Sequence, residues 1–197
     1  MIALLTLALT GGSIARAQFV VPTSYTFSIA PNSNANSYPD TGGGELIDTT
    51  LGLSFGNYTS DSQAGAWTGW VNTVPTVSFQ FGSAQTFSRI EVGTTRHDAA
   101  AVGLPSTITI SGTTFNFTSG SMANDTRNWL VLDGTFSTTT GSNLLAIAFG
   151  SSTSQWLMLD EVRFTAIPEP AAAAALIGAM LVGVTIVTRR RSRIAPS

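Results

Sequence analysis

The chain has 197 residues, of which 10% are charged, and it contains neither cysteine nor lysine. The lack of cysteine excludes disulfides, thiolate metal sites and cysteine nucleophiles. Between Gln18 and Ala166, ten acidic residues and four arginines give a net charge of about −6, which argues against binding to nucleic acid, because phosphate neutralisation needs clustered Lys and Arg.

The first seventeen residues have the pattern of a secretory signal peptide. An apolar stretch over residues 2–9 is followed by the small-residue motif Ala15-Arg16-Ala17, which is typical of a cleavage site before Gln18. No Lys or Arg precedes the apolar stretch, so the amino terminus alone supplies the positive charge of this segment. We therefore expect the chain from Gln18 onward to be exported.

Short apolar runs that alternate with polar residues fill the chain between Gln18 and Ala166. Turn signals rich in Gly and Ser separate these runs, and no stretch has the periodicity of an amphipathic helix. We expect strands over residues 25–29, 77–81, 108–110, 115–117, 130–132 and 157–164. The pattern predicts an all-β fold, a single antiparallel β-sandwich or jelly roll of roughly eight or nine strands.

Three further segments allow more specific structural predictions. Residues 143–150 are nearly all apolar, which is typical of a central strand buried on both faces. The run FSRIEV departs from strict alternation, which indicates an irregularity at Ser88-Arg89. In the last strand, strict alternation places Asp160 and Glu161 on opposite faces, so one of these carboxylates would point toward apolar neighbours.

Several short motifs follow one another along the middle of the chain. They are Tyr38-Pro39-Asp40, Glu45-Leu46-Ile47-Asp48, Trp70, VSFQFG, RIEV, LPSTITISG from Leu104 and the closing WLMLDEVRF. In this order they resemble the galactose-binding-like fold, the sandwich of discoidin or coagulation factor 5/8 type C domains. The resemblance extends from Tyr38 to Phe164 and implies a sandwich that binds its ligand at one loop end. One departure is Asp48-Thr49, where that family often has Asp-Gly.

Acidic residues in an early loop indicate a candidate calcium site. Asp40, Glu45 and Asp48 fall within nine residues of a Gly-rich segment, and calcium binds six to eight oxygen ligands. The resemblance implies a structural calcium between such a loop and an acid near the end of the last strand. We therefore take Asp40, Asp48 and Glu161 as candidate ligands of this cofactor. In the alternative interpretation, these acids are solvated, or Glu161 pairs with an arginine such as Arg89.

Three residues are candidates for binding a carbohydrate. Sugar recognition places an aromatic ring against the apolar face of the sugar, with planar polar groups at its rim. Arg96 and His97 stand in the loop that helps to line the ligand end in the resembled fold, and Trp67 is a candidate aromatic platform. In the alternative interpretation, a Trp in a strand belongs to the core and a lone His on a loop is solvated.

The sequence argues against an enzyme. It contains no Gly-x-Ser-x-Gly elbow, no HExxH and no phosphate loop. With one histidine and no cysteine, a nucleophile–His–Asp triad would have to use His97. We expect a non-catalytic domain.

The C-terminal segment combines a short motif with an apolar run. The run over 171–187 is uncharged, and its seventeen residues would span roughly 26 Å as a helix, close to the thickness of a bilayer core of about 30 Å. A buried core helix of this length is the alternative, but such a helix rarely ends in RRRSR. We expect a transmembrane helix over 171–188, with its arginines in the cytoplasm. The motif residues are Pro168, Glu169, Pro170, Arg189, Arg190 and Arg191.

This order of triplet, apolar helix and arginine cluster resembles the PEP-CTERM sorting signal of Gram-negative bacteria, over Ile167 to Ser197. The resemblance implies that the secretion machinery and an exosortase are partners and that the inner-membrane anchor is transient. It also implies a mature protein in the cell envelope, on the surface or in an exopolysaccharide matrix. The expected segments are a signal peptide (1–17), a β-sandwich (18–166) and a sorting segment (167–197).

Two functions from different classes remain open at this point. The first is an exported, exosortase-processed protein whose sandwich binds carbohydrate or exopolysaccharide without catalysis. The second is a structural or adhesive, membrane-anchored envelope protein with no small-molecule ligand.

Overall fold

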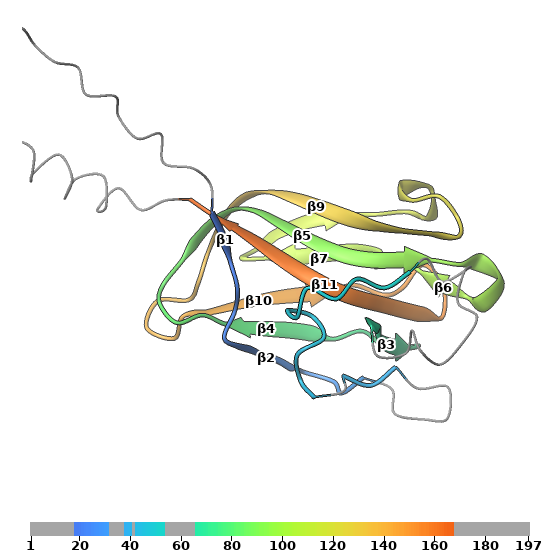
Figure 1. Ribbon diagram of the computed structural model, residues 1–197. Helices are drawn as coiled ribbons and strands as arrows, with labels where there is room; N and C mark the ends of the chain where they lie inside the picture. The colour runs from blue at the N-terminus through green and yellow to red at the C-terminus, as the bar shows by residue number, and fades with distance from the viewer. Residues whose placement is uncertain (1–17, 32–37, 41, 54–65, 168–197) are drawn as a thin grey trace, which may run out of the picture. The chain divides into compact units, whose positions relative to one another are not determined.

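The computed structural model describes residues 18–31, 38–40, 42–53 and 66–167, which form two stacked β-sheets (Figure 1). The expected signal peptide, the Pro168-Glu169-Pro170 motif, the helix over 171–188 and the terminal arginines lie outside these residues. Within the described ranges, no helix is long and apolar enough to cross a bilayer. Residues 18–167 form one compact unit.

The first sheet has six strands and is organised around the long strand β11. Its order is β1-β11-β5-β9, and β3 and β6 also pair with β11. All its pairings are antiparallel except that of β6 with β11. The strands are β1 (Gln18–Val20), β3 (Thr68–Val71), β5 (Thr86–Arg96), β6 (Val102–Gly103), β9 (Thr126–Ser137) and β11 (Trp156–Ala166).

The second sheet has five antiparallel strands in the order β2-β4-β10-β7-β8. Its strands are β2 (Ser24–Phe27), β4 (Thr76–Gln80), β7 (Thr107–Ile110), β8 (Thr113–Asn116) and β10 (Leu144–Phe149). Two single-turn 3-10 helices lie wholly within the described residues, η3 (Asp98–Ala100) and η4 (Ser119–Ser121), and these residues contain no α-helix. The expected all-β fold of two packed sheets is therefore confirmed.

The number of strands exceeds the expected eight or nine because β1, β3 and β6 were not anticipated. These strands have three, four and two residues, too few for a period of two to stand out in the sequence. Each of them pairs with β11. Pairing with a long neighbouring strand, rather than their own residue pattern, makes them strands.

The hydrophobic core lies between the two sheets. Phe79 and Phe81 come from the β4 side, and their rings contact the Phe164 ring of β11 with centroids 4.9 Å and 5.1 Å apart. All three side chains are buried, and full burial of such a side chain stabilises the fold by about 1.5–3 kcal/mol. The alternating residues of the expected strands supply most of this core.

Strand β10 differs from the sequence expectation. It is central in its sheet, between β4 and β7, as a nearly continuous apolar run predicts. However, it is not buried on both faces: Leu145, Ile147 and Phe149 point into the core, whereas Ala146 is exposed. Two of the outward positions are alanines, Ala146 and Ala148, whose small side chains face solvent at little cost.

A bulge in β11 overturns the expectation of strict alternation there. The pairing of β11 with β5 shifts register between Leu159 and Glu161, and Leu159 and Val162 both belong to the core cluster. Two residues, Asp160 and Glu161, therefore occupy the space between consecutive core positions. Both carboxylates lie on the outer side of the sheet, and neither points into the apolar core. The irregularity expected at Ser88-Arg89 is confirmed by the register shift of β5 against β9.

Candidate functional site

One end of the sandwich carries a cluster of charged side chains, which we call the loop end and define as residues 96–101 and 118–125. Arg96, the last residue of β5, is its anchor. Arg96 Nε and Nη2 donate to the two carboxylate oxygens of Asp98 at 2.8 Å and 2.7 Å, a bidentate pair. Arg96 Nη1 donates to the carbonyl oxygen of Met122 at 2.8 Å and also to that of Ser119. One guanidinium thus ties the two loops together.

The other polar groups of the loop end are also held by hydrogen bonds. His97 Nδ1 contacts Asp125 Oδ1, and the backbone N–H of Asp98 donates to Asn124 Oδ1 at 2.7 Å. The side chains of Asp98 and Asp125 remain 56% and 53% exposed, so their oxygens still face solvent. Asp125 has a positive φ of 56°, a conformation that Asp and Asn tolerate better than most residues. The loop end therefore presents an ordered set of planar polar groups.

An aromatic ring lies at the same end of the molecule. Trp156 begins β11, and its backbone N–H donates to the carbonyl oxygen of Ala101 at 2.9 Å. The ring is partly buried and packs edge-on against Tyr38, with centroids 5.8 Å apart. Figure 1 shows the start of β11 beside β6 at this end of the sandwich. The polar loop cluster thus has an aromatic neighbour across β6.

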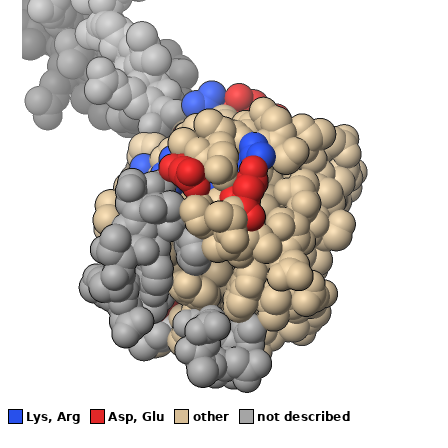
Figure 2. All heavy atoms as spheres, turned by 90° about the vertical axis from the view of Figure 1, so that its right-hand side faces the viewer, with Lys and Arg blue, Asp and Glu red and all other residues tan. Residues whose placement is uncertain are grey.

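Figure 2 views the molecule toward this end. Charged side chains gather in small groups near the top of this face, with acidic and basic atoms side by side. Most of the other described residues on this face are uncharged. An arrangement of this kind offers hydrogen-bond donors and acceptors to a ligand without a strong field of one sign. Such a surface suits a neutral ligand with many hydroxyl groups.

The expectation that Trp67 offers an open ring face is wrong. Trp67 is fully buried, in a small cluster with Tyr38, Val102 and Met158. A Cβ atom added at Gly52 would lie 2.2 Å from Trp67 Cε2, so the backbone of the early loop covers the ring directly. Trp67 is a core residue, the alternative that sequence alone had left open. Its Nε1 has no hydrogen-bond partner within the described part of the chain.

The three candidate calcium ligands bond to separate protein donors. Asp40 Oδ1 accepts from the Tyr25 hydroxyl at 2.8 Å, Asp48 Oδ1 accepts from the Thr50 N–H at 2.7 Å, and Glu161 Oε2 accepts from the Thr49 N–H at 3.0 Å. Among the described residues, no group of three His, Asp or Glu side chains is placed to hold a metal ion. The calcium site stays a prediction without geometric support.

Asp160 has a partner that the sequence did not reveal. Arg127 Nε and Nη2, on β9, donate to its two oxygens at 2.8 Å and 2.9 Å across strand β5. Asp160 is fully buried, and the Gly52 N–H also donates to it at 2.9 Å. The bridge passes over Gly93, where an added Cβ would lie 2.0 Å from Asp160 Oδ1. Burial raises the pKa of Asp160, and the hydrogen bonds from Arg127 and Gly52 oppose that shift.

Glu161 does not form the ion pair with Arg89 that was one alternative. Arg89 instead donates to Asp133 on β9 at 2.7 Å. Burial raises the pKa of Glu161 to about 7, a shift that the Thr49 N–H and the positive charge of Arg163 oppose. Glu161 therefore titrates near neutral pH.

No protein-family model and no curated protein matches this chain. The chain is similar to the family 32 carbohydrate-binding module of C. perfringens NanJ in complex with galactose, at TM-score 0.44 and 12% identity over 76% of this chain and 99% of that one. It is also similar to the CBM32 of AlyQ in complex with 4,5-unsaturated mannuronic acid (TM-score 0.40, 13% identity, 75% and 97% coverage). A chitosan-binding module from Paenibacillus sp. IK-5 is similar at TM-score 0.42 and 14% identity, over 76% and 99% of the two chains. Similarities at this level carry no information about the ligand of this chain.

Proposed function

We propose that residues 18–166 form a non-catalytic carbohydrate-binding domain and that the loop end holds the sugar. The observation that supports this proposal is the ordered set of planar polar groups around Arg96. Because Arg96 bonds to both loops, His97, Asp98 and Asp125 are held in place before any ligand arrives. A pre-organised site loses less conformational entropy on binding, which favours affinity for a weakly interacting ligand such as a sugar.

The charges of the loop end favour a neutral sugar over an acidic one. Arg96 is neutralised by Asp98, and Asp125 adds a second carboxylate beside His97. The exposed carboxylate oxygens accept hydrogen bonds from hydroxyl groups, whereas they would repel a ligand carboxylate. Trp156, at the same end, supplies a partly exposed aromatic surface.

The function of the whole chain includes export and sorting. We propose that residues 1–17 direct secretion and that an exosortase processes the chain near Pro168-Glu169-Pro170. The mature domain would then lie in the envelope, on the surface or in the exopolysaccharide matrix of a Gram-negative cell, after a transient stay at the inner membrane. The intact mass of the protein recovered from its native cells tests this. A mature pool that still contains residues 171–197 would replace the transient anchor with a permanent one.

Sugar binding is tested with a matched pair of variants. A glycan array probed with the protein identifies the ligand, and calorimetry then compares Asp125→Asn with Asp133→Asn. Asn keeps the shape of Asp and tolerates the positive φ of residue 125, so the fold should survive the first change. Asp133 pairs with Arg89 outside the loop end and serves as the control.

We expect Asp125→Asn to weaken binding and Asp133→Asn to leave it unchanged. Equal affinities for both variants would place the sugar elsewhere on the domain. No binding to any glycan on the array would leave the structural or adhesive envelope protein as the function.

A further inference from the structure

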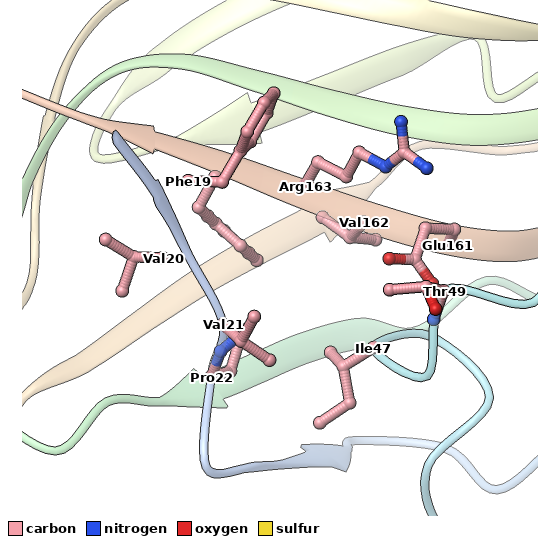
Figure 3. Close-up of a pocket in the computed structure, with 10 residues that line it drawn as sticks. Phe19, Val20, Val21, Pro22, Ile47, Thr49, Glu161, Val162 and Arg163 are labelled. Carbon is pink, nitrogen blue, oxygen red and sulfur yellow. The ribbon is translucent and has the colours of Figure 1, made fainter. Parts of the chain in front are cut away.

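An apolar hollow lies beside β11, between β1 and the loop at residues 47–49 (Figure 3). The hollow has a volume of about 250 Å³. Apart from Thr49, Glu161 and Arg163, the residues that line it are apolar. Phe19 and Val21 border it and are 63% and 64% exposed, so part of this apolar surface faces solvent. A ligand in this hollow is therefore in contact mainly with hydrocarbon.

The carboxylate of Glu161 is the polar group that this hollow offers to a ligand. Glu161 is only 3% exposed. Its Oε2 accepts the Thr49 N–H at 3.0 Å, and Figure 3 shows its other oxygen turned away from Thr49, toward the hollow. Within the described part of the chain, this second oxygen accepts no hydrogen bond. A buried carboxylate oxygen without a donor is costly, so a ligand that donates to it is favoured.

The charges around Glu161 favour a cationic donor. Among the described residues, no cation lies within ion-pairing distance of its carboxylate. Arg163 is the cation among the described groups that act on Glu161, but its guanidinium lies over the Trp129 ring, with Cζ 4.4 Å from the centroid. Asp48 adds negative charge, whereas the charge of Asp160 is balanced by an ion pair of its own. The hollow therefore attracts a positive group.

The single free oxygen and the apolar lining indicate which cation fits. A guanidinium binds a carboxylate best through two parallel hydrogen bonds, and here one oxygen is already bonded to the Thr49 N–H. An ammonium is a compact point charge that needs only one oxygen. The hydroxyl groups of an amino sugar would lose hydrogen bonds to water against an apolar wall. A lysine side chain, an ammonium on an aliphatic stem, meets both conditions.

Three observations favour a lysine of a partner protein as the source of this ammonium. A free amine inside the hollow leaves the outer faces of Phe19 and Val21 in water, whereas a protein surface around an inserted side chain shields them. A second copy of the chain is excluded as the source, because the chain contains no lysine. The net charge of about −6 between Gln18 and Ala166 also complements a surface that carries lysine.

We propose that the hollow receives a lysine side chain of a partner protein, whose ammonium binds Glu161 and whose stem lies against Phe19 and Val21. The site is separate from the loop end, and it does not require that the loop end bind any ligand. The domain thus has two contacts of different kinds, a polyhydroxyl ligand at the loop end and a protein beside β11.

The test measures binding of three matched peptides to the full-length chain in phosphatidylcholine nanodiscs, by surface plasmon resonance. The buffer contains EDTA and is held at about pH 8, where Glu161 is ionised. The probe is acetyl-Gly-Ser-Lys-Ser-Gly-amide, and its two controls carry Nε-acetyl-lysine or arginine in place of lysine. We expect the lysine peptide to bind with a Kd below about 1 mM. Both controls should bind more weakly, the acetylated one by at least about tenfold, the order expected for a lost charge-assisted hydrogen bond.

Three variants assign the binding to the hollow. Glu161→Gln keeps the shape of the side chain and removes its charge, so it should weaken binding of the lysine peptide by at least about tenfold. Phe19→Ser alters an exposed side chain and should weaken binding by about fourfold, as expected for the loss of roughly one methylene of apolar contact. Glu91→Gln is the matched control on β5, outside the lining of the hollow, and should have no effect. Circular dichroism establishes that each variant is folded.

Several results would overturn the proposal. These are absence of binding by the lysine peptide, equal binding of the acetylated peptide, and equal effects of Glu161→Gln and Glu91→Gln. If Glu161→Gln does not fold, unchanged binding in Phe19→Ser refutes the site. Loss of peptide binding in about 1 mM calcium would assign the carboxylate to a metal ion. Equally tight binding of cadaverine, a free diamine, would make the occupant a small molecule and exclude the partner protein.

A further variant separates this site from the loop end. Asp125→Asn alters the loop end and should leave the affinity for the lysine peptide unchanged. If Asp125→Asn weakens binding of the peptide and Glu161→Gln does not, the ammonium binds at the loop end and the site beside β11 is refuted.

Discussion

Two arginine–aspartate pairs on the outer side of the six-stranded sheet have the same chemistry and opposite environments. Arg127 and Asp160 meet under the early loop, with the aspartate fully buried. Arg89 and Asp133 meet in solvent, with side chains 47% and 64% exposed. Burial therefore decides how much each pair contributes. A buried carboxylate depends on its partner because water cannot replace it, whereas an exposed pair exchanges its hydrogen bonds with water at little cost.

The largest effect should come from removing the partner of Asp160. Among the described residues, Arg127→Met leaves the buried carboxylate with backbone N–H donors alone, those of Gly52 and of Asp160 itself, and loss of one member of a buried pair costs about 3–5 kcal/mol. Chemical denaturation followed by circular dichroism measures this change. The double variant Arg127→Met/Asp160→Asn, which removes the charge as well, should recover part of the loss. If the double variant is no more stable than the single one, uncompensated charge is not the cause.

The next effect on stability should come from Gly93, over which Arg127 reaches Asp160 across β5. In Gly93→Ala, the new methyl group would lie 2.0 Å from Asp160 Oδ1 and 2.4 Å from Arg127 Nη2, so the ion pair must shift. We expect a loss of about 1–3 kcal/mol, typical of overpacking at a tight site, in the same denaturation experiment. Gly82→Ala is the matched control, because nothing lies within 4 Å of a Cβ at that position. Equal stability of the two variants would mean that the crossing is loosely packed.

An effect of similar size should appear as a pH dependence, caused by Glu161. Its folded-state pKa of about 7 lies above the ordinary value of 4.5, so folding takes up a proton between these values. The contribution of Glu161 to stability is therefore complete below pH 4.5 and is lost as the pH rises through 7.

We expect the difference in unfolding free energy between wild type and Glu161→Gln to change by roughly 1–3 kcal/mol from pH 5 to pH 8. The variant should become relatively more stable as the pH rises. Denaturation curves at a series of pH values measure this. Parallel profiles for the two proteins would show that Glu161 does not titrate in this range.

The smallest effect should come from the exposed pair. Arg89→Gln removes a surface ion pair whose members remain accessible to water, so the melting temperature should stay within experimental error of wild type. Differential scanning calorimetry at low and at moderate salt checks this. A clear loss of stability that persists at moderate salt would indicate that this pair is shielded from solvent in solution, and it would weaken the contrast with Arg127–Asp160.

Several elements of the fold followed from local patterns. Alternation located the inward residues of β4, β7 and the second half of β11, because each of these strands has one face against the core. The irregularity at Ser88-Arg89 was visible because two polar residues in succession break the period. The bulge at Asp160-Glu161 has the same signal, two polar residues in succession between Leu159 and Val162, but strict alternation was expected there and the bulge was missed.

The candidate sites were less predictable than the fold. Arg96 and His97 were selected as neighbours in one loop, and the structure places them in the polar loop end. Trp67 could not be distinguished from an exposed aromatic, because its cover comes from Gly52, fifteen residues earlier. Arg127 and Asp160 are 33 residues apart, and no local pattern links them.

The sequence alone determined the class of the domain, since a period of two and Gly-rich turns are properties of neighbouring residues. It also determined the absence of thiol chemistry and the shortage of positive charge. Only the tertiary structure decided which acids are buried and which arginines pair with them. These properties depend on which segments meet across a sheet: the loop at residues 49–52 covers Asp160 and Glu161, and Arg127 reaches Asp160 over Gly93. Contacts between residues far apart in the chain follow from the packing of the whole domain, which no short stretch of sequence encodes.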